Sequence, residues 1–340
     1  QGIEEYLFFL YKNGVDAIII ADPGIVDIAK KTVPELPIHL STQANVTNYA
    51  SANFWFNRGI KRLNIARELS LPEISELRTK VHGELEIFVH GSLCISYSGR
   101  CLLSNYFTDR DANRGQCAHP CRYHYAVTEE KRPGQYFPVE EDERGTYIFN
   151  SKDLCLLTLL PQIISAGVHS LKIEGRMKSI FYVGGVVRVY WAALDFLKEQ
   201  PESAWDEPSN IILPIAMLEE IKKIGTRGIT SNFIKGKPTN RDMLYDTSRE
   251  DQMVEPIAVV RCTNGPTLVE IRNRVEVGEV IEYMGEGMIV QSVTILSMEN
   301  EEGETLGRAN PGDIVVIKTS PKLVAPKVNG IMRRHRADTG

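Results

Sequence analysis

Six cysteines are the residues of this chain whose type and spacing are best suited to chemistry. Four of them fall within the stretch EIFVHGSLCISYSGRCLLSNYFTDRDANRGQCAHPC, at Cys94, Cys101, Cys117 and Cys121, and Cys155 follows further along the chain. The first residues, QGIEEYLFFLYKNG, read as an amphipathic helix rather than a secretory signal, so the thiols are expected to be reduced. Reduced thiolates bind zinc, copper(I) or iron–sulfur clusters, and short loops punctuated by glycine can wrap several of them around one inorganic centre.

Three interpretations of these thiols stay open on spacing alone. Structural zinc favours close Cys-x₂-Cys pairs, and only Cys117 and Cys121 come near that spacing, with a wider gap. A 4Fe–4S cluster needs four thiolates and places little demand on the sequence between them. Cysteines that stay reduced and bind nothing are the third interpretation. Cluster, zinc and plain reduced cysteines therefore carry equal weight from spacing.

The elements around the cysteines alternate short apolar runs with helical periods, which predicts an α/β fold of βα units with a parallel sheet. Strands are expected at residues 16–21, 37–42, 62–66, 85–90 and 170–175. Helices are expected at residues 25–32, 47–58, 70–80, 152–166 and 179–198. A closed (β/α)₈ barrel needs eight strands. Either the sheet is open, or three βα units lie upstream of Gln1.

Polar residues recur just after the expected strands, where the chemistry of a (β/α)₈ barrel is placed. They are Asp22, Gln43, Asn45, Arg67, Glu68, His90, Glu174 and Arg176. Any single one of them more often caps a helix or satisfies a loop than does chemistry. Their recurrence after every strand favours a site collectively.

Basic and aromatic residues are interleaved in the cysteine stretch. The arginines are Arg100, Arg110, Arg114 and Arg122, and the aromatic residues are Tyr97, Tyr106, Phe107, Tyr123 and Tyr125. This mixture suits phosphate contacts and base stacking in RNA binding. The alternative is a solvated loop whose arginines pair with Asp109, Asp111 and Glu129. Both interpretations stay open.

The period changes along the chain and divides it into regions. Residues 1–199 read as a partial (β/α)₈ barrel with a cysteine-rich insertion at 91–147, and 200–253 as a linker and helix. Short β runs with glycine turns predict a small antiparallel β-barrel at 254–320, and 321–340 reads as a flexible basic tail. The net charge of −5 argues against nucleic-acid binding through bulk charge, but not against a local basic groove. No apolar run is long enough for a membrane span, so a cytoplasmic protein is expected.

The stretch EIFVHGSLCISYSGRCLLS closely resembles the signature of the collagenase-like peptidase family, number 32 among peptidases of unknown catalytic type. The resemblance extends through DAIIIADPG, PIHLSTQANVTN and ARELSL upstream, and through NRGQCAHPCR, EKRPGQYFPVEEDERGTYIFNSKDL and HSLKIEGRMKS downstream. It implies a TIM-like barrel whose first strands precede Gln1, followed by a small C-terminal β-barrel. Within the family, the sequence is most similar to a branch that hydroxylates tRNA.

That branch implies an oxygen-sensitive 4Fe–4S cluster on Cys94, Cys101, Cys117 and Cys121. This chain departs from it by also carrying Cys155, a position that relatives acting in quinone hydroxylation use as a ligand. Whether Cys121 or Cys155 is the fourth ligand is therefore open, with Cys121 favoured. The resemblance further implies 5-hydroxylation of the wobble uridine of tRNA without dioxygen, with prephenate as the oxygen source and an unidentified electron donor.

Roles for the polar rim follow from this resemblance. Arg67, Lys172 and Arg176 are expected to hold a carboxylate-bearing donor, with Gln43, Arg100 and Arg122 as further substrate-binding residues. His90, Glu68 and Glu174 are candidate proton-transfer groups. The first alternative is a peptidase, as the family name says, although no recognised nucleophile–base pair or zinc-protease motif is present. The second is a non-catalytic iron–sulfur or zinc accessory protein.

Overall fold

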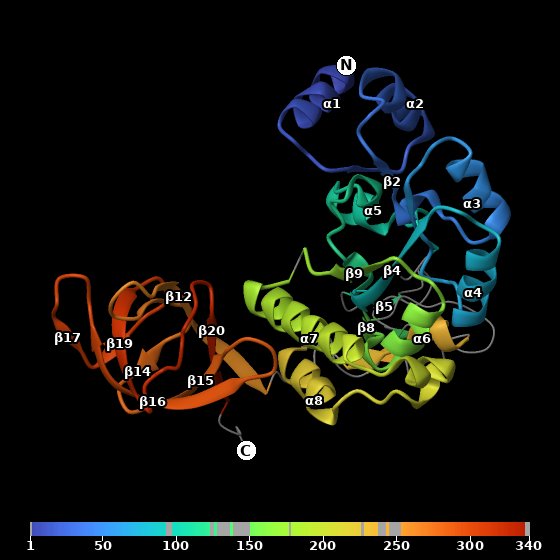
Figure 1. Cartoon of the computed structure of the whole chain (residues 1–340). Helices are drawn as coiled ribbons and strands as arrows, with labels where there is room; N and C mark the ends of the chain where they lie inside the picture. Colours follow the sequence, from blue (N-terminus) through green and yellow to red (C-terminus); the bar gives the residue numbers. More distant parts are fainter. Residues whose placement is uncertain are drawn as a thin grey trace. The chain divides into compact units, whose positions relative to one another are not determined.

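A computed structural model of the chain describes residues 2–92, 97–122, 126–127, 137–138, 150–176, 178–225, 228–236, 243–244 and 253–336. The chain forms two compact units (Figure 1). Unit 1 comprises residues 1–174, 202–211 and 227–249, and unit 2 comprises 175–201, 212–226 and 250–340. Each unit has its own sheet and its own core, and each is described by itself below.

Unit 1 is built on one mixed sheet. Its strands are β1 (Ile18–Ile20), β2 (Ile38–Leu40), β3 (Arg62–Asn64), β4 (Glu84–Gly91), β8 (Asp153–Cys155), β9 (Ser170–Glu174) and β10 (Ile229–Thr230). The order β1-β2-β3-β4 is parallel throughout, and β9 also pairs with β4 in parallel. The predicted α/β class is confirmed. Over the described residues the sheet is open, so the closed barrel stays a prediction.

The strand β8 departs from the expected βα rhythm. The sequence predicts one helix over 152–166, whereas the structure has β8, the 3-10 turn η4 (Leu157–Leu159) and the short helix α6 (Leu160–Ser165). Three residues, here Asp-Leu-Cys, are too few for periodicity to distinguish a strand from a helix, so strand pairing decides the structure. Because β4 ends where the insertion begins, the chain re-enters at that same sheet edge, and β8 runs antiparallel to β4 and parallel to β10.

Three of the first four helices of unit 1, α2 to α4, start at residues whose side chains cap them. The four helices are α1 (Ile3–Lys12), α2 (Pro23–Thr32), α3 (Tyr49–Phe56) and α4 (Leu71–Thr79). The Asp22 side chain accepts a 2.9 Å hydrogen bond from the Ile25 N–H, and Pro23 opens the first turn of α2. Ser70 and Glu73 form a capping box at the start of α4.

The cysteine-rich insertion is described over 91–92, 97–122, 126–127 and 137–138. It contains helix α5 (Leu103–Thr108) and the 3-10 turns η2 (Ala112–Arg114) and η3 (Pro120–Arg122). Two short antiparallel pairs accompany it: β5 (Ala126–Val127) with β6 (Phe137–Pro138), and β7 (Asn150–Ser151) with β11 (Met243–Leu244). The turn η3 packs against α5 and against β7. The segment of residues 97–122 is called the thiol segment below.

The predicted linker, residues 201–210, folds as two 3-10 turns in unit 1. They are η5 (Glu202–Asp206) and η6 (Pro208–Asn210), and η6 packs against α6. A further 3-10 turn, η7 (Asn232–Lys235), follows β10.

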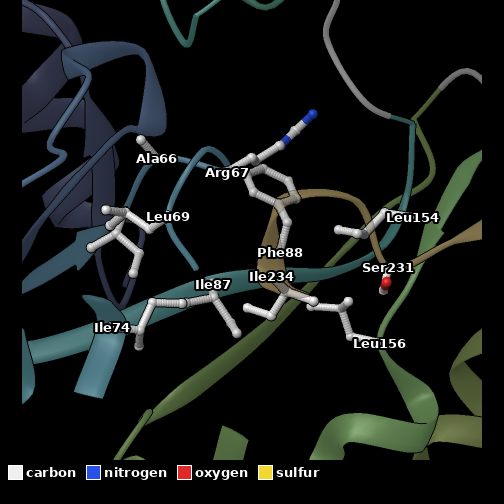
Figure 2. A pocket seen from close by; sticks show the side chains of 11 residues that line it. Ala66, Arg67, Leu69, Ile74, Ile87, Phe88, Leu154, Leu156, Ser231 and Ile234 are labelled. Carbon is white, nitrogen blue, oxygen red and sulfur yellow. The ribbon is translucent and has the colours of Figure 1, made fainter. Parts of the chain in front are cut away.

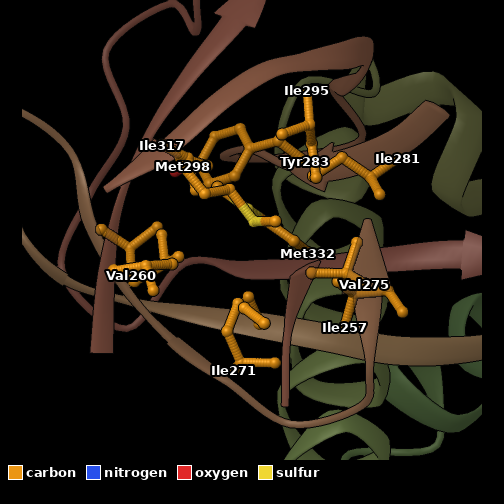
Figure 3. Close-up of a cluster of buried hydrophobic side chains, with 14 of the residues drawn as sticks. Ile257, Val260, Ile271, Val275, Ile281, Tyr283, Ile295, Met298, Ile317 and Met332 are labelled. Atoms are coloured by element: carbon orange, nitrogen blue, oxygen red, sulfur yellow. The ribbon is translucent and has the colours of Figure 1, made fainter. Parts of the chain in front are cut away.

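Unit 2 contains a closed antiparallel barrel of six strands, as the sequence predicts. They are β12 (Val254–Cys262), β13 (Leu268–Ile271), β15 (Val280–Met284), β16 (Val290–Glu299), β19 (Ile314–Ser320) and β20 (Ile331–His335). The order is β15-β20-β12-β13-β19-β16, and pairing of β16 with β15 closes the ring. The short strand β17 (Thr305–Leu306) pairs with β16 in antiparallel, and β14 (Val275–Glu276) pairs with β18 (Arg308–Ala309). Side chains such as Ile257, Val260, Ile271, Met298 and Met332 fill the interior (Figure 3).

The predicted flexible tail at 321–340 is wrong for its basic part. Residues 331–335 form β20, which lies between β12 and β15. The side chain of Arg333 is fully buried, where its guanidinium forms ion pairs with Glu220 and, at 2.6 Å, with Glu282. A buried cation is retained when it is paired in this way. The basic sequence therefore marks a core strand.

The helices of unit 2 are α7 (Ile180–Lys198) and α8 (Ile215–Ile224), which pack together. A Cβ on Gly185 would lie 2.6 Å from Ile224 Cδ1, so glycine allows this close approach. By length and composition alone, α7 could cross a membrane. Eight of its residues are buried, and Arg188 donates to the backbone carbonyls of Gly285 and Ile289 at 2.9 and 2.7 Å. These contacts make α7 a core helix of unit 2.

Candidate functional site at the carboxyl edge of the unit 1 sheet

One face of the unit 1 sheet is polar and densely paired. Six residues at alternate strand positions make up this polar sheet face: Arg62, Asn64, Glu84, Glu86, Ser170 and Lys172. Glu86 is its centre. Its carboxylate accepts hydrogen bonds from Ser170 Oγ at 2.7 Å and Asn64 Nδ2 at 3.1 Å, and it pairs with Lys172 Nζ at 3.2 Å. Arg62 bridges Glu84 at 2.8 Å and Glu86 at 3.5 Å.

The ionisation of this face follows from its contacts. Burial alone would raise the pKa of Glu86, but the Ser170 hydrogen bond and the charges of Lys172 and Arg62 outweigh it and hold the pKa below its ordinary value. Burial lowers the pKa of His39, and the charge of Arg62 lowers it further. Glu86 is therefore ionised and His39 neutral near pH 7, and the face is an internal ionic network.

Arg67 lies above this face at the carboxyl edge of the sheet. Its guanidinium stacks on the ring of Phe88, with 3.7 Å from Cζ to the ring centroid (Figure 2). Its Nη1 donates to the Ser92 carbonyl at 2.7 Å, and its Nη2 lies 3.8 Å from Glu174 Oε2. Planar stacking combined with a fork of donors is a geometry that lysine cannot reproduce. Arg67 thus fixes the backbone at the start of the insertion.

The neighbouring Glu68 binds Ser98, at the start of the thiol segment. Its Oε1 accepts a 2.9 Å hydrogen bond from the Ser98 N–H, and the Ser98 hydroxyl lies 3.4 Å from both carboxylate oxygens. Ser98 is buried, and its Oγ also accepts a 3.3 Å hydrogen bond from Thr42 Oγ1. Arg67 and Glu68 therefore clamp Ser92 and Ser98, the described residues on either side of Cys94.

The backbone of the thiol segment lies directly against the rim. A Cβ on Gly99, whose φ is +79°, would lie 2.1 Å from the Gln43 carbonyl oxygen. Gln43 Nε2 in turn donates to the Ala112 carbonyl at 3.3 Å. A second close approach joins the ends of β4 and β9, where a Cβ on Gly91 would lie 2.2 Å from the Glu174 carbonyl oxygen. Only glycine permits backbones this close.

The predicted ligands are placed unevenly. Cys101 and Cys117 are half-buried, Cys121 and Cys155 are buried, and Cys94 lies outside the described residues. No disulfide joins any of the cysteines that the structure describes. Within the described ranges, no three His, Cys, Asp or Glu side chains gather closely enough to hold a metal ion. The thiols have the donor chemistry for an iron–sulfur cluster or zinc. The fifth candidate ligand, Cys155, differs from the others because it lies on a strand of the sheet.

Cys155 sits opposite His90. The two residues are cross-strand partners in the antiparallel pairing of β4 and β8, and both are buried, His90 to 2% exposure. The Leu156 N–H continues the pairing with a 2.8 Å hydrogen bond to the Val89 carbonyl. Cys155 therefore belongs to the sheet, whereas Cys101, Cys117 and Cys121 belong to the insertion that covers its carboxyl edge.

The other predicted site residues separate into groups. Lys172 is engaged with Glu86, whereas the side chain of Glu174 keeps 32% of its surface exposed beside Arg67. Arg100 is exposed on the thiol segment. Arg176 is exposed and opens unit 2, and Arg122 ends η3, with its side chain outside the described atoms.

Sequence reasoning missed the polar sheet face and the role of Ser98. The signal was present in the strands themselves: Glu84 and Glu86, Arg62 and Asn64, and Ser170 and Lys172 are each two residues apart. Because side chains alternate between the faces of a strand, this spacing indicates a polar face on an otherwise buried sheet. No comparable local signal marks Ser98.

A small cavity lies beside Phe88, which lines it together with Ile74 of α4. Its lining includes Ile74, Ile87, Leu156 and Ile234, with Arg67 and Ser231 as polar members (Figure 2). Its volume of about 20 Å³ is room for one water molecule and no substrate. The carboxyl edge and the thiol segment, rather than this cavity, make the candidate site.

Known proteins are similar to this chain over most of its length. The tRNA hydroxylation protein P of Escherichia coli K12 is 37% identical over 345 residues, covering 88% of this chain and 73% of that protein. The tRNA hydroxylation protein P1 of Bacillus subtilis 168 is 34% identical over 327 residues, covering 95% and 76%. A 23S rRNA 5-hydroxycytidine synthase of Escherichia coli K12 is 35% identical over 191 residues, covering 56% and 28%.

Two family models account for nearly all of the described chain. The model of peptidase family U32 matches residues 1–244, which include the polar sheet face, the rim and the thiol segment. The model of the peptidase family U32 C-terminal domain matches residues 255–333, which include all six strands of the barrel ring up to Arg333 in β20. The chain belongs to peptidase family U32.

Proposed function

We propose that this protein is an RNA-modifying enzyme that hydroxylates tRNA. The observation that carries the proposal is the similarity to two tRNA hydroxylation proteins, which extends over most of the chain. A relative named as an rRNA 5-hydroxycytidine synthase supports the wider class of RNA hydroxylation. The cytoplasm, where tRNA is found, is the proposed compartment.

The finer proposal is 5-hydroxylation of the wobble uridine. The reaction replaces the hydrogen on C5 with a hydroxyl group, which is a two-electron oxidation of the base. It balances if a hydroxylated carboxylic acid supplies the oxygen, its C–O bond breaks, and it takes up the hydrogen that C5 loses. Prephenate, from the resemblance, is the proposed donor. Because this exchange consumes no net electrons, the electron donor that the resemblance implies would only reduce the cofactor before turnover.

The proposed cofactor is a 4Fe–4S cluster on Cys94, Cys101, Cys117 and Cys121, with Cys155 as the competing fourth ligand and zinc as the alternative metal. Support comes from donor chemistry, because thiolates are the ligands that such centres prefer. A bound cluster would supply electron transfer or activation of the oxygen donor. Positioning, proton transfer and substrate binding are assigned to residues of the chain itself.

The contacts suggest how those residues divide the work. Arg67 and Glu68 position Ser92 and Ser98, because each side chain is hydrogen-bonded to the backbone of one of them. Glu174 is the proposed proton-transfer group, since its carboxylate stays partly exposed at the rim. His90, on β4, is buried and lies opposite Cys155 of β8. Gln43, Arg100, Arg122, Lys172 and Arg176 remain proposed substrate-binding residues.

The geometry does not favour a peptidase. A peptidase needs a nucleophile and a base that reach the substrate. His90 and Ser92, the nearest such pair in sequence, are 2% and 6% exposed, and the Ser92 carbonyl is bound by Arg67. Neither side chain is accessible to a peptide.

The decisive experiment uses the protein purified without oxygen. Iron, sulfide and visible absorption are measured for the wild type and for Cys94, Cys101, Cys117, Cys121 and Cys155 changed singly to Ala, with Cys262→Ala in unit 2 as the matched control. We expect iron to be lost in four variants and retained in the control. Zinc in place of iron would sink the cluster proposal.

The activity is tested separately on RNA. Nucleosides of tRNA are analysed from a host strain that lacks its own tRNA hydroxylation proteins, with and without this protein. Appearance of 5-hydroxyuridine or its derivatives supports the proposal. Unchanged tRNA, together with cleavage of denatured collagen by the pure protein, would favour the peptidase instead.

A further inference from the structure

We propose that α5 and the turns flanking it form the surface that binds the single-stranded loop of the RNA substrate, an inference that rests on the proposed function. The surface comprises Tyr97, Arg100, Leu102, Tyr106, Phe107, Arg110 and Arg114, here called the α5 surface. It deepens the proposed function by naming the part of the RNA that is recognised and the side chains that recognise it.

The aromatic side chains of this surface face solvent. Tyr106 is 81% exposed, Tyr97 is 64% exposed and Phe107 is 49% exposed. Tyr106 and Phe107 meet edge to face, with ring centroids 5.1 Å apart. Leu102, one helical turn before Tyr106, is 73% exposed and extends the apolar face. Exposed rings clustered on one short helix are a stacking platform for unpaired bases.

The arginines of this surface are available for phosphate. Arg100, Arg110 and Arg114 are exposed, and within the described residues none of them forms an ion pair, although Asp109 and Asp111 flank Arg110 in sequence. For these three arginines the geometry favours RNA binding over pairing with Asp109 and Asp111, whereas Glu129 lies outside the described residues. A solvated loop that neutralises its own arginines would show those pairs. Unpaired guanidinium groups interleaved with rings fit a nucleic-acid strand, whose phosphates and bases alternate.

The opposite side of α5 fastens this surface to the thiols. Ser104 is fully buried, and its Oγ accepts a 2.9 Å hydrogen bond from the Ala118 N–H, one residue after Cys117. Thr108 Oγ1 donates to the Ser104 carbonyl at 2.6 Å, and α5 packs against η3, which contains Cys121. Gln43 and Glu68 tie the flanks of α5 to the rim of the sheet. A base stacked on α5 therefore lies over the thiol segment.

These features select a loop rather than a duplex. Bases in an RNA duplex are stacked on each other, and their faces cannot reach a protein ring, whereas loop bases can be splayed out. The overall negative charge of the chain also disfavours unspecific attraction to any polyanion, so binding depends on this local patch. A hairpin with an unpaired loop is thus the expected ligand.

Fluorescence anisotropy tests the proposal with the full chain and a labelled RNA hairpin that has a seven-nucleotide loop containing uridine. Tyr106→Ala is expected to weaken binding by about 5- to 100-fold, the loss of one stacked base. Tyr106→Phe keeps the ring and is expected to bind within about twofold of the wild type. Arg110→Ala is expected to reduce the slope of log Kd against log salt by about 0.7, the value for one phosphate contact on a single strand.

Matched controls separate the surface from general effects. Tyr6→Ala removes a 56%-exposed ring on α1, and Lys12→Ala removes an exposed charge from the same helix; both are expected to bind like the wild type. A loop-free duplex of the same stem is expected to bind at least tenfold more weakly. Equal binding of duplex and hairpin, or unchanged binding by Tyr106→Ala, would overturn the proposal, as would a protein that binds no hairpin at all. Selective loss in the α5 variants supports the surface even if the protein hydroxylates no RNA, so the two proposals fail separately.

Discussion

Glu68 and Ser98 are 30 residues apart in sequence, yet the Glu68 carboxylate accepts a 2.9 Å hydrogen bond from the Ser98 N–H. The adjacent Arg67 binds the Ser92 carbonyl from the other side. Two consecutive residues at the end of one βα unit therefore hold both described flanks of Cys94. These two contacts join the rim of the sheet to the cysteine-rich insertion. Their loss should therefore make the thiol segment less ordered.

Replacing Glu68 with Ala should loosen the thiol segment. The Ser98 N–H would lose its acceptor, at a cost of about 1–3 kcal/mol. We expect faster hydrogen exchange in residues 97–108 and a lower iron content after anaerobic purification. Glu68→Gln keeps an acceptor oxygen, so its exchange rate and iron content should lie between those of the wild type and Glu68→Ala. The control, Glu76→Ala, removes a carboxylate that is paired with Lys80 on the exposed surface of α4 and should change neither readout. Unchanged exchange in Glu68→Ala would show that the clamp is not needed.

Replacing Gly99 with Ala should displace the same segment by a different route. The new Cβ would meet the Gln43 carbonyl oxygen at 2.1 Å, and backbone cannot move aside as a flexible side chain can. Gly14→Ala is a close control, because its φ of +74° matches the +79° of Gly99 while its Cβ would meet nothing within 4 Å. Both variants carry about 1–2 kcal/mol of backbone strain. Only Gly99→Ala should lose protection in residues 97–108, and equal effects in the two variants would refute the close contact.

Much of unit 1 could be predicted because its signals are local. Asp22 with Pro23, and Ser70 with Glu73, are capping patterns that lie within four residues of the helix starts they set. Each of the strands β1 to β4 overlaps a strand expected from the sequence, at 16–21, 37–42, 62–66 and 85–90. Secondary structure that depends on neighbours in sequence is readable from the sequence.

The errors lie where distant partners decide the structure. Residues 331–335 read as a flexible tail because they are rich in arginine, but Glu220, 113 residues away, neutralises Arg333 inside unit 2. Residues 153–155 read as the start of a helix, but pairing with β4 and β10 makes them a strand. Ser98 carries no motif, and its role depends on Glu68 and Thr42.

The ionic network on the polar sheet face should make the stability of unit 1 depend on pH. The pKa of Glu86 is held below its ordinary value, although burial alone would raise it. The stabilisation is therefore complete above the unfolded-state pKa of about 4.5 and is lost as the pH falls through the lower folded-state pKa. Glu86→Gln should cost about 1–3 kcal/mol at pH 7, since Lys172 and Ser170 lose a charged acceptor. Urea unfolding, followed by the fluorescence of buried Trp55, should show this gap closing towards pH 3.

The matched control for this effect is Glu76→Gln on α4, whose carboxylate is 58% exposed. Exposed ion pairs contribute about 0–1 kcal/mol, so this variant should follow the wild type at every pH. A gap between wild type and Glu86→Gln that stays constant from pH 7 to pH 3 would mean that folding does not lower the pKa of Glu86.

Ending the chain at Gly330 should prevent unit 2 from folding, because β20 is an interior strand of the barrel. Without it, β12 and β15 each lose a paired neighbour, and Glu220 and Glu282 lose the buried charge of Arg333. Removing one member of a buried ion pair costs about 3–5 kcal/mol, so Arg333→Ala alone should lower the melting temperature of unit 2 markedly. A chain ending at Arg336 keeps all of β20 and is the control. Circular dichroism during heating should show the transition of unit 2 in the control and not in the shorter chain. A full transition in the chain ending at Gly330 would restore the interpretation of these basic residues as a dispensable tail.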